Sequence, residues 1–257
     1  MMRHLIAIPL LTLAVSCAGC DWMPGKPTKA EEPELPSDVL AFTTLYTNNC
    51  SGCHGANGTF GAARPMNDPL YLSLASDDYL STITADGVAH TLMPAFSTAN
   101  GGGLTPEQIQ ELLKGMRRNW GGFEIASETP TAPALQTKVP GDAARGRTLF
   151  LSHCSACHGN DGTGGAKAGS VVNDSFLALA SDQALRSTII CGRRDLGMPD
   201  YRGELDGQPV AERQGLQPLT DQGVSDLVAW LISHRQPFPG APFPTLEAPD
   251  GSGTQVP

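Results

Sequence analysis

The sequence predicts an all-α protein of two tandem domains with long loops, joined by a Pro-rich linker. The main observation is that segments 37–123 and 141–236 repeat each other along their length. Their apolar residues recur with helical spacing, and no segment shows the period of two expected for a strand. The 257 residues, 40% of them hydrophobic, allow two small domains with thin apolar cores.

The first twenty residues have the form of an export signal of the lipoprotein type. Arg3 and His4 precede the apolar run LIAIPLLTLAV, and small residues surround Cys17 and Cys20. Because VSCAGC resembles a lipoprotein cleavage site, we expect lipidation of Cys20, with Cys17 as the alternative. The mature protein is therefore expected outside the cytoplasm, anchored by lipid on the periplasmic side of a bacterial membrane.

Three other segments are rich in proline and lack helical or strand periodicity. Residues 21–36 are expected to be a disordered tether, residues 124–140 a linker and residues 237–257 a disordered tail. The net charge is −9 and the chain has no Lys/Arg-rich run, so we expect no nucleic-acid partner.

Each repeat is expected to begin and end with a helix. Residues 42–49 and 146–153 carry the i, i+3, i+4, i+7 pattern. In the first repeat the closing helix follows Thr105, which forms a capping box with Gln108, and in the second it follows Thr220. The second repeat also contains an insertion, RGELDGQPVAERQG, which is either a partner-docking loop or an idle surface segment.

The motif CxxCH ends the first helix of both repeats, and its residues are Cys50, Cys53 and His54, then Cys154, Cys157 and His158. This motif is typical of covalent haem c attachment, since one helical turn brings both thiols to one edge of the macrocycle and the adjacent imidazole binds the iron. A zinc site would need further ligands nearby, yet the two motifs are 104 residues apart, and a thioredoxin-like site would need a βαβ setting. We therefore expect two covalently bound haem c groups.

A methionine follows each motif at nearly the same distance. Met93 lies 39 residues after His54 and Met198 lies 40 residues after His158, and each precedes a proline. This recurrence favours axial ligation of iron over core filling. A thioether ligand raises the reduction potential and closes the coordination shell, which suits electron transfer. His90 is an alternative ligand for the first iron.

Both repeats resemble class I cytochrome c domains. The family pattern is Gly-x-x-x-aromatic before CxxCH, a Met-Pro loop, and a closing helix whose aromatic side chain packs across the first helix. The second repeat has all of it, with Gly146, Phe150 and Trp230. The first has Phe42 in place of the glycine and Gly115 in place of the tryptophan, so we expect altered helix packing there.

The resemblance implies a respiratory electron carrier and not an enzyme. Membrane-tethered di-haem members of the family carry electrons from a quinol-oxidising complex or dehydrogenase to a terminal acceptor. They do so either as shuttles or as fixed subunits of a reductase or oxidase complex. Redox partner proteins and the membrane are therefore the expected partners.

An alternative function is the oxidation of a small sulfur compound such as thiosulfate. The resemblance to sulfur-oxidising di-haem cytochromes would allow Cys191 to bind the second iron as a thiolate in place of Met198. Arg193 and Arg194 would then lower its pKa. The simpler interpretation of Cys191 is a buried apolar thiol.

Overall fold

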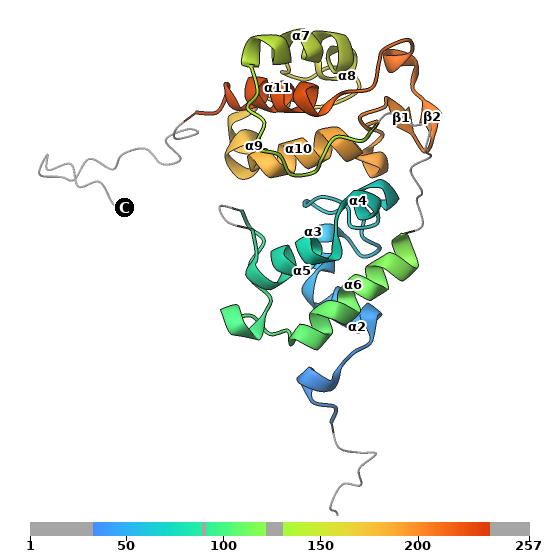
Figure 1. The fold of residues 1–257 in the computed structure, drawn as a ribbon, viewed down its shortest axis with the longest axis vertical. Helices are drawn as coiled ribbons and strands as arrows, with labels where there is room; N and C mark the ends of the chain where they lie inside the picture. The colour runs from blue at the N-terminus through green and yellow to red at the C-terminus, as the bar shows by residue number, and fades with distance from the viewer. Residues whose placement is uncertain (1–32, 89–90, 122–130, 237–257) are drawn as a thin grey trace, which may run out of the picture. The chain divides into compact units, whose positions relative to one another are not determined.

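The computed structural model describes residues 33–88, 91–121 and 131–236 (Figure 1). The predicted signal with Cys17 and Cys20, most of the predicted tether, the predicted tail, and His90 lie outside these residues. The described residues from Leu40 onward, which include both repeats, belong to one compact unit. Within the described residues, no helix has the length and hydropathy needed to span a bilayer.

The first repeat is helical wherever its structure is described. A 3-10 turn, η2 (Pro36–Asp38), precedes it, and a second, η3 (Thr98–Asn100), lies before its last helix. The α-helices are α2 (Phe42–Asn49), α3 (Ser51–His54), α4 (Pro69–Leu74), α5 (Asp77–Asp86) and α6 (Pro106–Trp120).

The second repeat has a counterpart of each of these α-helices in the same order. In Figure 1, α11 lies between α7 and α10, and it contacts both. The helices are α7 (Ala143–His153), α8 (Ser155–His158), α9 (Asp174–Leu179), α10 (Asp182–Cys191) and α11 (Asp221–Ile232), with 3-10 turns η4 (Arg194–Leu196) and η5 (Ala211–Arg213). The all-α prediction and the internal repeat are confirmed.

One short hairpin departs from the all-helical expectation. Strands β1 (Glu204–Leu205) and β2 (Gln208–Pro209) pair antiparallel within the insertion of the second repeat. Asp206 and Gly207 connect them with φ angles of 51° and 75°. Asp-Gly is the dipeptide that favours a two-residue hairpin turn with both residues in the left-handed region. The strands are too short for periodicity to reveal them.

Side-chain caps fix the start of the closing helices as the sequence predicts. The Gln108 N–H donates to Thr105 Oγ1 at 3.2 Å, and the Thr105 N–H donates to Gln108 Oε1 at 3.0 Å. At the start of α11 the Gly223 N–H donates to Thr220 Oγ1 at 3.1 Å. Each cap satisfies a main-chain donor that has no partner within the helix.

The helix crossing in the second domain depends on a glycine opposite a tryptophan. A β carbon on Gly146 of α7 would stand 2.8 Å from the Trp230 β carbon and closer still to the Asp226 carbonyl oxygen on α11. The rings of Phe150 and Trp230 pack with centroids 4.1 Å apart. The family-like packing expected for this domain is therefore present.

The first domain reverses the large and small residues at the corresponding crossing. Phe42 on α2 fills the space beside Gly115 on α6, where any β carbon would collide with the Phe42 ring. Trp120, five residues further along α6, packs against Phe42 and Tyr46 with centroids 5.4 Å and 4.9 Å away. The expectation of altered packing is confirmed, and the aromatic contact is restored from a different position of the helix.

Part of the predicted linker packs against the second domain. Pro133 and Leu135 are buried, and the Ala134 N–H donates to the carboxylate of Asp221 at 3.0 Å. Arg186 Nε donates to the Ala134 carbonyl at 2.9 Å. These contacts order residues on the carboxyl side of the predicted linker.

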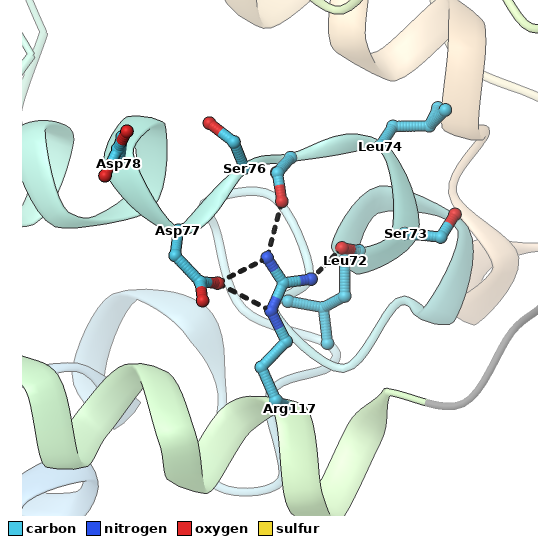
Figure 2. A pocket seen from close by; sticks show the side chains of 8 residues that line it. Leu72, Ser73, Leu74, Ser76, Asp77, Asp78 and Arg117 are labelled. Carbon is cyan, nitrogen blue, oxygen red and sulfur yellow. Dashed lines mark hydrogen bonds and ion pairs between the residues drawn. The ribbon is translucent and has the colours of Figure 1, made fainter.

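An arginine joins the closing helix to the turn between the middle helices in each domain. In the first, Arg117 binds the carbonyls of Leu72 and Ala75 and the carboxylate of Asp77, across a surface hollow shown in Figure 2. In the second, Arg235 makes the equivalent contacts with Leu177, Ala180 and Asp182. The hollow contains none of the predicted haem ligands.

Candidate haem-binding sites

The two CxxCH motifs adopt the same main-chain turn. In the first motif, the Cys50 carbonyl accepts from the N–H of Cys53 at 3.2 Å and from that of His54 at 3.0 Å. The corresponding distances to the Cys154 carbonyl are 3.1 Å and 3.0 Å. Each motif thus presents two thiols and an imidazole from a single helical turn, as covalent haem attachment requires.

The four motif cysteines are unbridged thiols. Burial raises the pKa of Cys50 to about 11, and burial likewise raises the pKa of Cys154 to about 11. Both are therefore protonated at neutral pH. A thiol in this state carries the hydrogen and the sulfur that add across a vinyl group when a thioether forms.

Each motif histidine has one ring nitrogen fixed by a main-chain carbonyl. Nδ1 of His54 lies 2.7 Å from the Arg64 oxygen, and Nδ1 of His158 lies 2.9 Å from the Gly169 oxygen. In the neutral tautomer Nδ1–H donates to that oxygen and Nε2 keeps its lone pair, which is the arrangement typical of metal-binding histidine. Burial also lowers the pKa of His54, which favours the neutral ring.

The methionine loops are held against the preceding helix by matching glycines. Gly87 follows α5 with φ of 75°, and a β carbon there would lie 2.8 Å from the Met93 carbonyl oxygen. Gly192 follows α10 with φ of 72° and approaches the Met198 carbonyl oxygen in the same way. The structure thus places both methionines, which are half-buried, in equivalent loops.

Two tryptophans support the loop after each motif, and only one of them was identified from the sequence. A β carbon on Gly58 would lie 3.1 Å from Cη2 of Trp120, and one on Gly162 would lie 3.2 Å from Cη2 of Trp230. Both glycines stand four residues after the motif histidine. That shared spacing was the available signal for Trp120, which has no counterpart at its aligned position.

The environment of Cys191 favours the thiol and not the thiolate. Burial raises its pKa to about 12. Arg193 pairs with Asp195 at 2.9 Å, and Arg194 pairs with Asp206 at 2.9 Å. Both arginines are thus bound to carboxylates. The buried apolar thiol is the interpretation that the structure favours.

The residues of both sites fit a covalently attached haem. Each site offers two free thiols, an imidazole with Nδ1 fixed and a methionine in a constrained loop. His90, the alternative ligand for the first iron, lies outside the described residues. Ligation by Met93 and Met198 stays a prediction that rests on their equivalent placement.

Comparisons with known proteins agree on one family. The model for the family described as cytochrome c oxidase, cbb3-type, subunit III matches residues 37–114 and 141–212. These two matches fall within the two predicted domains. They also confirm that the repeats are related domains and not a chance similarity of motifs.

Two curated relatives match across both repeats. The cbb3-type cytochrome c oxidase subunit FixP of Bradyrhizobium diazoefficiens is 33% identical over 172 residues, which are 65% of this chain and 56% of that protein. The subunit CcoP of Cereibacter sphaeroides is 27% identical over 182 residues, which are 64% of this chain and 55% of that protein. The chain therefore spans about half the length of these relatives.

A solved structure of low similarity was also found. It is a chain of the reducing HAO-like protein complex Kustc0457/Kustc0458 of Kuenenia stuttgartiensis, with 16% identity and a TM-score of 0.40. The match covers 83% of this chain and 99% of that chain.

Proposed function

The chain belongs to the cbb3-type cytochrome c oxidase subunit III family, and we propose that it passes single electrons toward a terminal oxidase of that type. Its two domains are cytochrome c domains that bind covalently attached haem c. The observation that carries the proposal is the repetition of one haem-binding arrangement in both domains, down to the hydrogen bonds of the motif turn.

The residues of each site have separate roles in this function. Cys50 and Cys53 hold the first haem, and Cys154 and Cys157 hold the second. The two histidines and the two methionines bind iron from opposite sides, so neither water nor substrate has a free position. Bound haem supplies a one-electron couple whose potential is raised by the thioether ligand. The chain itself fixes the ligands and needs no group for acid-base chemistry.

The proposed partners are the other subunits of a cbb3-type oxidase and an electron donor such as a quinol-oxidising complex. The proposed location is the periplasmic side of a bacterial membrane, with lipidated Cys20 as the anchor. Both follow from the relatives named as oxidase subunits together with the export signal in the sequence. Thiosulfate oxidation receives no support from the site, since Cys191 is a buried thiol.

The test of haem binding is expression in a host with cytochrome c maturation machinery. The wild-type mass should exceed that of the mature chain by two haem groups. Cys50→Ala with Cys53→Ala, and separately Cys154→Ala with Cys157→Ala, should each leave one haem per chain. A colourless wild-type protein without added mass would refute the proposal.

The test of the partner is purification from membranes in mild detergent. A stable complex that contains the chain together with haem-copper oxidase subunits is expected. Recovery of the chain alone, with rapid electron exchange to a separate oxidase, would instead identify a shuttle. Thiosulfate-dependent reduction of the purified protein with turnover would identify the enzyme.

A further inference from the structure

The insertion of the second domain lies between two hydrogen bonds that have equivalents in the first domain. In the first domain the Leu104 N–H donates to the Phe96 carbonyl at 2.8 Å, and in the second the Leu219 N–H donates to the Tyr201 carbonyl at 2.9 Å. The first domain bridges this interval with STANGGG, which has no charged residue. The second uses a segment longer by ten residues that contains several charges.

Most charged side chains of this segment have partners of opposite charge. Arg202 binds Asp200 and Glu204, with its Nη1 3.0 Å from the latter. Glu212 pairs with Lys167, and Asp206 pairs with Arg194. These pairs account for the exposed charges of the insertion and leave one arginine to explain.

Arg213 is buried without an ion pair to any described carboxylate. The residue is 8% exposed, and its Nε has no hydrogen-bond partner in the described part of the chain. Its Nη2 donates only a long hydrogen bond, of 3.4 Å, to the Tyr201 carbonyl. Asp200 attracts it, but Arg202 Nε already donates to that carboxylate at 3.0 Å. A buried cation without a counter-charge is unfavourable unless an anion binds there.

The loop of Arg213 lies against the second haem motif. The Leu216 N–H donates to the Arg213 carbonyl, and the next residue, Gln217, has its carbonyl 3.2 Å from Nε2 of His153. His153 directly precedes Cys154. The charge of Arg213 also opposes the effect of burial on the Cys154 thiol, so the guanidinium acts at the motif itself.

We propose that Arg213 is a positioning residue that pairs with a propionate carboxylate of the second haem and thereby raises its reduction potential above that of the first. This inference rests on the proposed function. A fixed positive charge favours ferrous over ferric iron because the ferric form carries one more positive charge. The first domain has no charge at the matching interval.

The consequence is a preferred direction of internal electron transfer. One electron passes from the first haem, which is oxidised, to the second, which is reduced, and no further reactant is needed. At equilibrium in the half-reduced protein the electron therefore resides mainly on the second haem.

The test compares three variants of the holoprotein by redox titration followed in the visible spectrum. Arg213→Met should make the second haem about tenfold harder to reduce, which is about 59 mV for one electron. The first haem should be unchanged, and the single-haem cysteine variants assign the two midpoints. Arg213→Lys should keep most of the wild-type potential because it keeps the charge. Arg147→Met, at a half-exposed arginine of the same domain, is the control and should shift neither midpoint.

Several outcomes would overturn the inference while the proposed function stands. These are two haems with unchanged midpoints in Arg213→Met, an equal loss in Arg213→Lys, or an equal loss in Arg147→Met. If Arg213→Met does not fold, NMR of the ferrous wild-type protein decides. A slowly exchanging Arg213 Nε–H with a cross-peak to propionate methylene protons supports the pairing, and a rapidly exchanging one without it refutes the pairing. A wild-type chain that lacks two reversible one-electron couples would refute the proposed function instead.

Discussion

Gly192 packs against the main chain of Met198 so closely that residue 192 has no room for a side chain. A β carbon there would stand 2.7 Å from the carbonyl carbon of Pro199 and closer still to the Met198 oxygen. The Met198 N–H and carbonyl also exchange hydrogen bonds of 3.0 Å with Arg193. In the first domain Gly87 has the same relationship to Met93, so this contact is a repeated device that fixes the proposed ligand.

Gly192→Ala should therefore disturb methionine ligation in the second domain. Alanine in the left-handed region costs roughly 1–2 kcal/mol, and the collision with the loop adds to this cost. We expect a weaker methionine-to-iron absorption band near the red edge of the visible spectrum, with both haems still attached. Gly103→Ala is the control, since a β carbon there meets nothing within 4 Å. An undiminished band in Gly192→Ala would contradict the role of the glycine.

Replacement of Met198 by alanine should open one iron to external ligands. Without the thioether, the ferrous protein should bind carbon monoxide at one haem per chain, and Met93→Ala should do the same at the other haem. Met116→Ala is the matched control because Met116 is a buried core residue of α6. It should lower stability by about 2–5 kcal/mol but bind no carbon monoxide. Carbon monoxide binding by the wild type would contradict methionine ligation.

Local chemistry explains which features the sequence predicts well. CxxCH, the Thr105 capping box and the helical periodicity are short-range patterns, and each has the expected structure. The positions missed depend on contacts between distant segments. Trp120 replaces Trp230 from a position shifted along the helix, and Arg117 and Arg235 do not align although they bind equivalent carbonyls.

Two further features had signals that could have been read. Gly87 and Gly192 each stand six residues before the methionine, and a glycine at one spacing in two repeats indicates a special backbone position. Asp206-Gly207 is a hairpin dipeptide. The burial of Arg213 had no such signal, because charge in an insertion is normally solvated and only the folded chain shows otherwise.

The exchange of large and small residues at the first helix crossing predicts a coupled pair. Gly115→Ala should destabilise the first domain by about 1–3 kcal/mol because its methyl group enters the space of the Phe42 ring. In a Phe42→Ala background the same substitution should cost little. Chemical denaturation of the four proteins gives the coupling energy, expected at about 1 kcal/mol or more. Additive costs would show that the two residues do not share the space.

Cys191→Ser should leave the haem ligands unchanged. Because burial raises the pKa of Cys191 to about 12, its thiol is neutral at physiological pH and is a poor iron ligand. Both methionine bands and both midpoint potentials should therefore match the wild type, as measured by optical titration. A methionine band that appears in the second domain only after this substitution would revive the sulfur-oxidising alternative.

The last prediction concerns the pH dependence of the second domain. Asp226 on α11 accepts from Arg145 Nε at 2.8 Å and from the Asp142 N–H at 2.7 Å, and it thereby ties α11 to the start of α7. The hydrogen bond from Arg145 lowers the pKa of Asp226 below its ordinary value of about 3.9.

The folded state therefore holds fewer protons than the unfolded chain in the pH range just below that value. The stabilisation by Asp226 is complete above about pH 4 and is lost as the pH falls through the lower pKa of the folded state. Denaturant titrations between about pH 6 and pH 2 should show this loss in the wild type. Asp226→Asn should be less stable at pH 6 and lose less stability on acidification. The double variant Lys114→Met with Glu111→Gln, at an exposed pair of the first domain, should retain the wild-type slope. Equal slopes for the wild type and Asp226→Asn would show that this carboxylate does not control the acid sensitivity of the domain.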